Sequence, residues 1–326
     1  MARVAVLDDW QGEAESLADW SALKARAEVV FFRDAIADPD ALVSALAGFD
    51  VVLAMRERSA LPGTTIRRLA DLRLLTFTGV RNAAVDIPAA TAQGVVVCNT
   101  VPSMPVDGTP ELAFGLLVAC ARHIPLADAR IRAGGFQAGV PLGQDLAGRT
   151  LGILGLGDIG GRMARYAQAF DMKVIAWSQN LTEARAREVG ARRVSKDELF
   201  AAADALTIHL RLSPRTRGLV GAAEIGRMKP GAILLNTSRG PIVDQAALLA
   251  ALHAGRIMAG LDVFEAEPLP SDHPLRTAPN TVLTPHLGYV TRQNMAELYQ
   301  ASIGNILAWL AGSPINVVNP EVLAQQ

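Results

Sequence analysis

The sequence predicts an α/β fold in two domains, each built on a parallel β-sheet. Short apolar runs with the length of buried strands recur along the chain, and stretches of helical periodicity separate them. The 326 residues suffice for two domains of about 150 residues each. The alternation breaks once, around Val101–Pro105, and then resumes, so we place the domain boundary there.

Five strands are predicted before this break. The first run ends in Asp8-Asp9, as expected of a buried strand that leads into a loop. After the break, Pro and Gly stay frequent as far as Pro110, and one long helix is predicted from Glu111 to about Ala133. We interpret that helix as the bridge between the domains. The predicted strands are Val4–Leu7, Val29–Phe32, Val51–Ala54, Leu74–Phe77 and Val95–Val97.

The second half repeats the alternation more strongly, and a last amphipathic helix is predicted at Asn294–Leu310. By itself this pattern indicates an α/β protein and no particular function, so function has to come from motifs. The predicted strands of this half are Thr150–Leu154, Lys173–Trp177, Ala205–Ile208, Ala232–Asn236, Met258–Asp262 and Thr281–Thr284.

Composition and charge exclude several classes of protein. With 31 basic and 32 acidic side chains, the net charge of −1 is not that of a nucleic-acid-binding protein. The dense apolar run Leu112–Ala121 falls short of the roughly twenty residues of a membrane span, and Asp8-Asp9 argue against a signal peptide. Cys98 and Cys120 make neither a disulfide framework nor a metal cluster. We expect a cytoplasmic protein without a metal, nucleic-acid or membrane partner.

The segment Gly155-Leu156-Gly157-Asp158-Ile159-Gly160 follows the predicted strand Thr150–Leu154 directly and opens a helical stretch. The first glycine permits a tight turn, the second lets backbone approach a pyrophosphate, and the third lets the helix pack against the strand. The helix N-terminus then offers free N–H groups to phosphates. The order of strand, glycine turn and helix favours a dinucleotide site, with Asp158 and Ile159 among the binding residues.

The next strand ends in Trp177-Ser178-Gln179-Asn180, with Ser178 where an acidic residue is expected to bond the adenosine ribose of NAD. Without that carboxylate nothing repels a 2′-phosphate. The nearest arginine in sequence, Arg185, does not follow directly. The choice between NAD and NADP therefore stays open.

Three polar residues, Arg239, Glu267 and His286, follow the carboxyl ends of late strands, where ligands bind in open α/β sheets. Each alone is an ordinary loop residue, but together and downstream of the glycine motif they favour a catalytic site. Reduction of a 2-oxo acid needs a cation to hold the carboxylate and polarise the ketone, and an acid to protonate the alkoxide. Imidazole is the one group of the three whose ordinary pKa lies near neutrality, and a carboxylate beside it would orient the ring.

Over nearly its whole length the chain resembles the D-isomer-specific 2-hydroxyacid dehydrogenases. The resemblance rests on four ordered motifs with the spacing of that family: Gly155–Gly160, Met228–Gly240, Leu261–Pro268 and Thr284–Gly288.

The resemblance implies a Rossmann-like cofactor domain, residues 102–287, inserted into a flavodoxin-like substrate domain formed by residues 1–101 and 288–326. It implies an NAD(P)-dependent oxidoreductase that transfers a hydride between nicotinamide and a small 2-oxo or D-2-hydroxy acid, most simply a glyoxylate or hydroxypyruvate reductase. A short 3-phosphoglycerate dehydrogenase, or a dinucleotide-sensing binding protein like the corepressors of this fold, stays as the alternative. It also implies a homodimer, with the helix from Glu111 resembling the dimerising bridge.

The family likeness also implies roles for single residues. Arg239 is expected to bind and polarise the substrate, His286 to donate the proton, and Glu267 to be its partner. Asp262 is expected beside the nicotinamide, although a loop-capping acid would fit the same position, and Thr237 to Arg239 are expected to line the cofactor cleft.

One substrate loop departs from the family pattern. Where the family usually has Gly-Val-Gly, this chain has Gly79-Val80-Arg81. We hypothesise that the backbone of Val80 and Arg81 binds the substrate carboxylate while the Arg81 side chain adds charge. Arg56 resembles another substrate-loop residue, although its charged neighbours also fit a solvated surface. Nothing in the sequence identifies the side chain of the 2-oxo acid.

Overall fold

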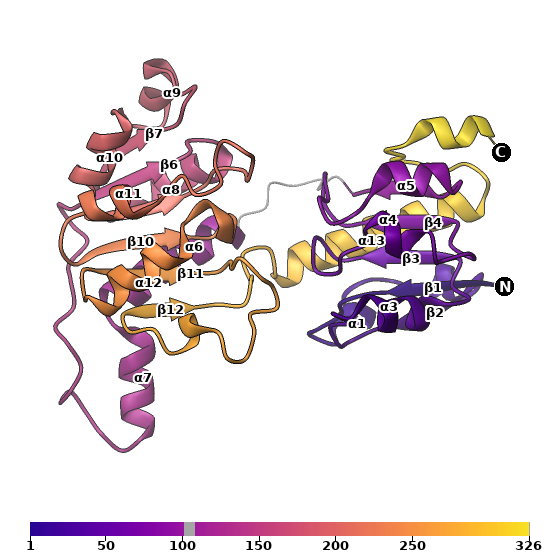
Figure 1. The fold of residues 1–326 in the computed structure, drawn as a ribbon, viewed down its shortest axis with the longest axis horizontal. Coiled ribbons are helices and arrows are strands. Elements are labelled where there is room, and N and C mark those ends of the chain that lie inside the picture. The colour runs from indigo at the N-terminus through magenta and orange to yellow at the C-terminus, as the bar shows by residue number, and fades with distance from the viewer. Residues whose placement is uncertain (101–107, 326) are drawn as a thin grey trace. The chain divides into compact units, whose positions relative to one another are not determined.

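The computed structural model describes residues 1–100 and 108–325. The chain divides into two compact units (Figure 1): unit 1 is Met1–Val106 with Thr291–Gln326, and unit 2 is Asp107–Val290. The expected boundaries were 101/102 and 287/288. The break in the strand–helix alternation at Val101–Pro105 lies outside the described residues.

Unit 1 contains a five-stranded sheet in the order β2-β1-β3-β4-β5, and every pairing in it is parallel. This is the strand order of flavodoxin-like folds, so the predicted fold class is confirmed. Each predicted strand overlaps an observed one, and β3 and β4 are buried along their whole length, as expected of apolar runs inside a parallel sheet. The strands are β1 (Ala2–Val6), β2 (Ala27–Phe31), β3 (Val51–Ala54), β4 (Leu74–Phe77) and β5 (Val96–Asn99).

The last helix, α13 (Arg292–Leu310), belongs to unit 1, although the whole of unit 2 separates it in sequence from the strands of unit 1. Asn305 is buried there, and its Nδ2 donates to the carbonyl of Asn99 at 2.8 Å and to Thr76 Oγ1 at 3.2 Å. The remaining helices of this unit are α1 (Ala14–Leu17), α2 (Ser21–Lys24), α3 (Pro39–Leu46), α4 (Gly63–Ile66), α5 (Ile87–Ala92) and the 3₁₀ turn η3 (Pro320–Gln325).

Unit 2 contains a seven-stranded sheet in the order β12-β11-β10-β9-β6-β7-β8, again parallel at every pairing. Across the sheet, the six strands β8, β7, β6, β9, β10 and β11 follow the Rossmann order 3-2-1-4-5-6, and β12 is added at the edge beside β11. Only β8 was not predicted, since its two exposed arginines form no apolar run. The strands are β6 (Thr150–Leu154), β7 (Lys173–Trp177), β8 (Arg192–Arg193), β9 (Ala205–Ile208), β10 (Ala232–Asn236), β11 (Ile257–Leu261) and β12 (Thr281–Leu283).

One helix of unit 2 differs from the prediction made from the sequence. The long helix predicted from Glu111 to about Ala133 is two helices, α6 (Gly108–Ala121) and α7 (Ile124–Arg132), bent by 64°. His123 between them has a left-handed φ of 52°, and Pro125 in the first turn of α7 lacks the N–H that a continuous helix needs. The others are α8 (Asp158–Ala169), α9 (Glu183–Glu188), α10 (Lys196–Ala202), α11 (Ala222–Arg227), α12 (Gln245–His253), η1 (Gly240–Ile242) and η2 (Pro274–Arg276).

No single helix in the described ranges is long and apolar enough to cross a membrane, and only the bent pair α6 and α7 reaches the required length together. Half of the α6 residues are buried, among them Leu116, Leu117 and Cys120, and these pack in the core of unit 2. Its apolar character is therefore that of a core helix.

The loop after β1 in unit 1 buries an acidic side chain. Asp8 has a left-handed φ of 61° and is 2% exposed, and its Oδ1 accepts a hydrogen bond from Ser59 Oγ at 3.1 Å. Burial raises the pKa of Asp8 to about 6, although the Ser59 hydroxyl and the Arg58 guanidinium oppose the shift. A carboxyl group with a raised pKa stabilises the folded unit while it is protonated, so this contribution is lost as the pH rises through about 6.

We therefore expect raising the pH from about 5 to about 8 to cost the wild-type protein about 1 kcal/mol more of unfolding free energy than it costs Asp8→Asn. Asparagine keeps the shape of the side chain but has no charge to acquire. Urea unfolding of both proteins at the two pH values measures the difference. An identical pH dependence in the two proteins would contradict this assignment.

Candidate active site

The glycine turn after β6 has two close backbone contacts and one open position, and each lies at the glycine where the sequence motif predicts it. Gly155 has a φ of +103°, and a Cβ there would lie 2.8 Å from the carbonyl oxygen of His209. At Gly160 a Cβ would overlap the carbonyl of Gly155, so α8 packs tightly against the turn. Around Gly157, by contrast, no described atom lies within 4 Å of the Cβ position. The backbone at Gly157 is therefore open to a ligand.

The first turn of α8 adds hydrogen-bond donors to this opening. Gly157 is the N-cap residue, and no side chain of the described residues caps the helix, so the first N–H groups remain for a phosphate. Asp158 and Ile159, two of the predicted cofactor-binding residues, lie in the first turn of the helix. The arrangement suits a pyrophosphate close to the backbone.

Two other cofactor candidates lie at the same edge of the sheet. Ser178 follows β7 directly, and Gly155 N donates to the carbonyl of the preceding Trp177 at 2.9 Å, so Ser178 is next to the glycine turn. Thr237 follows β10 and is 7% exposed, and its Oγ1 finds no hydrogen-bond partner within the described ranges. A buried hydroxyl of this kind calls for a partner, which a bound dinucleotide can supply.

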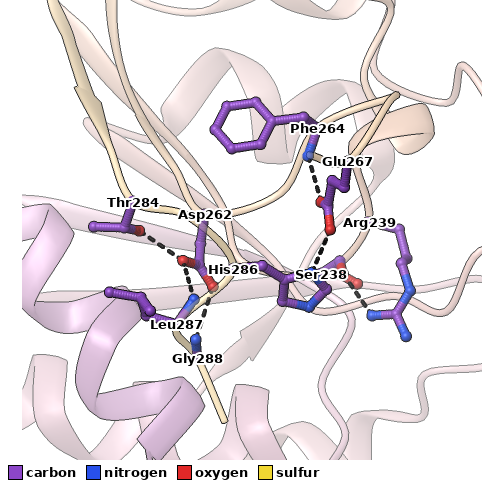
Figure 2. Close-up of polar contacts among 9 residues, drawn as sticks. All are labelled: Ser238, Arg239, Asp262, Phe264, Glu267, Thr284, His286, Leu287 and Gly288. Atoms are coloured by element: carbon purple, nitrogen blue, oxygen red, sulfur yellow. Dashed lines mark hydrogen bonds and ion pairs between the residues drawn. The ribbon is translucent and has the colours of Figure 1, made fainter. Parts of the chain in front are cut away.

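Asp262, directly after β11, is fully buried and joins two loops (Figure 2). Its carboxylate accepts hydrogen bonds from Thr284 Oγ1 at 2.6 Å, Leu287 N at 2.7 Å and Gly288 N at 2.9 Å. Burial raises the pKa of Asp262, and these three bonds and the nearby His286 oppose the rise. The residue thus has the loop-capping function that the sequence analysis considered as the other interpretation.

His286 lies in the loop that Asp262 holds, with its backbone N donating to the Asp262 carbonyl at 2.8 Å. Its ring Nδ1 is 2.6 Å from Glu267 Oε2, and Glu267 Oε1 accepts from Phe264 N at 2.8 Å. Burial on its own would raise the pKa of Glu267, but hydrogen bonding and charge from His286, the Phe264 N–H and the Arg239 charge hold it below its usual value. An ionised Glu267 fixes the ring, with Nδ1 toward the carboxylate and Nε2 away from it.

Arg239 lies in the loop after β10, and Asn236, the last residue of that strand, shapes this loop. Asn236 is buried; its Oδ1 accepts from Ser238 N at 3.0 Å and its Nδ2 donates to the Arg239 carbonyl at 3.0 Å. The Arg239 guanidinium donates to the Ser238 carbonyl at 2.8 Å and lowers the pKa of Glu267 through its charge. The structure thus brings Arg239, Glu267 and His286 together.

Two residues important for this geometry escaped the sequence analysis as individuals. Asn236 was considered only as the end of a strand, although a buried asparagine at that position is a signal in itself. Gly240 was part of a motif without a role. A Cβ on Gly240 would overlap the backbone of Phe264, so only glycine lets the Arg239 loop and the Glu267 loop touch.

The substrate-loop candidates form a second group, which belongs to unit 1. Arg56 follows β3 and its N donates to Thr78 Oγ1 at 2.8 Å, while Gly79 after β4 has a φ of +95°. A Cβ on Gly79 would overlap the Arg56 guanidinium, so the two loops are in contact. Val80 is 54% exposed and Arg81 is exposed. These residues gather at the carboxyl ends of two adjacent strands.

Comparison with known proteins identifies a matching family model and several relatives. A family model for the NAD-binding domain of D-isomer-specific 2-hydroxyacid dehydrogenases matches residues 114–288. A glyoxylate reductase of Aeropyrum pernix is 40% identical over 261 residues, which are 77% of this chain and 78% of that protein. A hydroxypyruvate reductase of Blautia hydrogenotrophica is 31% identical over 326 residues, 97% of this chain and 99% of that protein.

Relatives named for phosphoglycerate are also found. A D-3-phosphoglycerate dehydrogenase of Archaeoglobus fulgidus is 35% identical over 269 residues, 82% of this chain but only 51% of that longer protein. The crystal structure of a phosphoglycerate oxidoreductase from Vibrio cholerae superposes with a TM-score of 0.91 at 34% identity, covering 96% of this chain and 100% of that one.

The contact at Gly240 leads to a prediction about stability. We expect Gly240→Ala to lower the free energy of unfolding of unit 2 by about 1–3 kcal/mol, because a methyl group has to push the Phe264 backbone away. The matched control is Gly226→Ala in α11, where no described atom is within 4 Å of the new Cβ and helix propensity favours alanine. Chemical denaturation measures both variants. Equal stability of the two would show that Gly240 is not a packing constraint.

Proposed function

The chain belongs to the D-isomer-specific 2-hydroxyacid dehydrogenase family, and from this we propose that it reduces a small 2-oxo acid, of the glyoxylate or hydroxypyruvate type, with NADH or NADPH. The observation that carries the proposal is the His286–Glu267 pair at 2.6 Å, with the charge of Arg239 acting on the same carboxylate. These groups lie in the unit that also has the open glycine turn. A proton donor, a cation and a dinucleotide site are what this reduction needs.

The side chains divide the chemistry between them. When bound, the nicotinamide supplies a hydride to the carbonyl carbon of the substrate. His286 holds at Nε2 the proton that goes to the carbonyl oxygen, and Glu267 stabilises the imidazolium and keeps the ring oriented. Arg239 binds the substrate carboxylate and draws electron density from the ketone. In the opposite direction His286 accepts the proton of the hydroxyl group.

The cofactor would be held by groups whose surroundings suit it. The backbone at Gly157 and the first turn of α8 would bind the pyrophosphate, and the dinucleotide would give the Thr237 hydroxyl a hydrogen-bond partner. Asp262 would lie beside the nicotinamide, and it keeps the His286 loop in place through its three hydrogen bonds. For the substrate carboxylate, the candidates in unit 1 are the backbone amides of Val80 and Arg81.

The second candidate is a phosphorylated 2-oxo acid, the substrate class of a short phosphoglycerate dehydrogenase. Arg81, which stands where the family usually has glycine, is exposed in a loop that touches Arg56. Two guanidinium groups in adjacent loops would suit a substrate phosphate. The same arginines would serve a carboxylate alone, so the substrate has to be measured.

The direct test is to mix the purified protein with NADH or NADPH and a panel of 2-oxo acids and to follow oxidation of the cofactor. The panel is glyoxylate, hydroxypyruvate, pyruvate, phenylpyruvate and 3-phosphohydroxypyruvate. We expect turnover to be fastest with glyoxylate or hydroxypyruvate. Faster turnover of the phosphorylated acid would favour the second candidate. Tight cofactor binding without turnover of any acid would favour a dinucleotide sensor.

Variants assign the residues in the same assay. We expect His286→Ala to lower kcat by about 10²–10⁴-fold while cofactor binding persists, since it removes only the proton donor. Arg239→Ala should lower kcat and raise KM, because the cation contacts both the substrate and the transition state. Near-native turnover of His286→Ala would remove this residue from the mechanism.

We also propose that the protein is a cytoplasmic homodimer that associates through α7. No residue of this helix is buried, and its apolar side chains Ile124, Leu126 and Ile131 are 48%, 48% and 51% exposed. In the chain that follows, Phe136 is 73% and Leu142 is 95% exposed. Apolar surface of this extent on one segment is typical of an interface. The two free, buried cysteines agree with a reducing compartment.

Sedimentation velocity tests the dimer. We expect the wild-type protein to sediment as a dimer and Ile124→Asp/Ile131→Asp as a monomer, because two buried charges would oppose association. Leu323→Asp, at an exposed apolar residue of unit 1, is the control that should remain dimeric. A wild-type monomer, or a dimeric double variant, would contradict the proposal.

A further inference from the structure

The loop that follows β9 lies directly on the glycine turn. In the sheet β9 and β7 flank β6, so the loops after these strands border the turn after β6 from both sides. The contact is close, since a Cβ on Gly155 would lie 2.8 Å from the His209 carbonyl and 2.9 Å from Leu210 Cδ2. The residues after Leu210 therefore begin beside the part of the site where a dinucleotide would bind.

This loop carries three exposed arginines, Arg211, Arg215 and Arg217, and it is held by hydrogen bonds of its own. Ser213 N donates to Thr216 Oγ1 at 2.8 Å, and that hydroxyl donates to the Arg211 carbonyl at 2.7 Å. The backbone turn places the Arg215 guanidinium 3.5 Å from Gln179 Oε1. Arg215 thus reaches the loop after β7, next to Ser178.

The carboxylates that follow Ser178 on α9 are paired with arginines. Residues 178–180 contain no carboxylate, and both carboxylates of α9 are engaged elsewhere, Glu188 with Arg185 at 2.8 Å and Glu183 with Arg193 at 3.7 Å. Arg185, the arginine nearest in sequence, is therefore paired. The groups at this edge are the Ser178 hydroxyl, the Gln179 amide and the Arg215 guanidinium.

This combination suits one form of the adenosine ribose better than the other. A free 2′-hydroxyl is best recognised by a carboxylate, whereas a 2′-phosphate needs a cation and neutral hydrogen-bond donors. We infer that Arg215, with Ser178 and Gln179, forms a 2′-phosphate subsite and that the protein prefers NADPH to NADH. The inference rests on the cofactor site of the proposed function and adds a specificity-determining residue to it.

The test compares two ligands that differ only in the 2′-phosphate: adenosine 2′,5′-bisphosphate and adenosine 5′-monophosphate. By isothermal titration calorimetry the full-length wild-type protein should bind the bisphosphate at least about tenfold more tightly. Arg215→Ala should remove most of that difference and leave binding of the monophosphate unchanged. Ser178→Asp should also remove it, by like-charge repulsion. Arg217→Ala, in the same loop, is the matched control and should keep the difference.

Several outcomes would overturn the subsite. These are equal or tighter binding of the monophosphate by the wild-type protein, no binding of either ligand, or equal effects of Arg215→Ala and Arg217→Ala. Turnover of a 2-oxo acid with equal kcat/KM for NADH and NADPH would reject the subsite and leave the proposed function intact. A tenfold binding difference that depends on Arg215, without turnover of any acid, would support the subsite and reject the proposed function.

Discussion

The buried carboxylate of Asp262 is the interaction on which the candidate active site depends. It closes the end of β11 and receives donors from both sides of His286, namely Thr284 before it and Leu287 and Gly288 after it. A buried carboxyl group needs such hydrogen-bond partners, so the loop after β12 can take few other conformations. The left-handed φ of 55° at His286 is held within this loop. Asp262 therefore determines where the imidazole can be.

Close backbone contacts hold the other loops of the candidate active site in place. Gly240 lets the Arg239 loop lie against the Glu267 loop, and Gly155 lets the loop after β9 lie against the glycine turn. Any side chain at these glycines would separate groups that have to act together. Asn236 serves the same purpose through hydrogen bonds, because its amide fixes the turn that carries Arg239. Packing and polar contacts thus make a site out of loops that are separate in sequence.

Much of the fold could be predicted because parallel strands that are buried on both faces appear as continuous apolar runs. The runs at 150–154 and 232–236 are strands with those bounds in the structure. Two elements could not be predicted by this pattern. Strand β8 consists of two exposed arginines, and the helix predicted from Glu111 is broken at His123, two residues after the apolar run Leu112–Ala121 ends. The pattern of apolar residues indicates which segments are buried, but it does not indicate where the backbone changes direction.

The sequence by itself determined the glycine turn, the motifs that carry Arg239, Glu267 and His286, and the absence of an acid at residue 178, since each of these depends on residues next to one another in the chain. Only the tertiary structure decided which distant residues become neighbours. Arg215 stands 37 positions after Ser178, and it reaches the neighbouring Gln179 because β9 and β7 flank the same strand. Strand order is set by packing of the whole sheet, and no local pattern contains it.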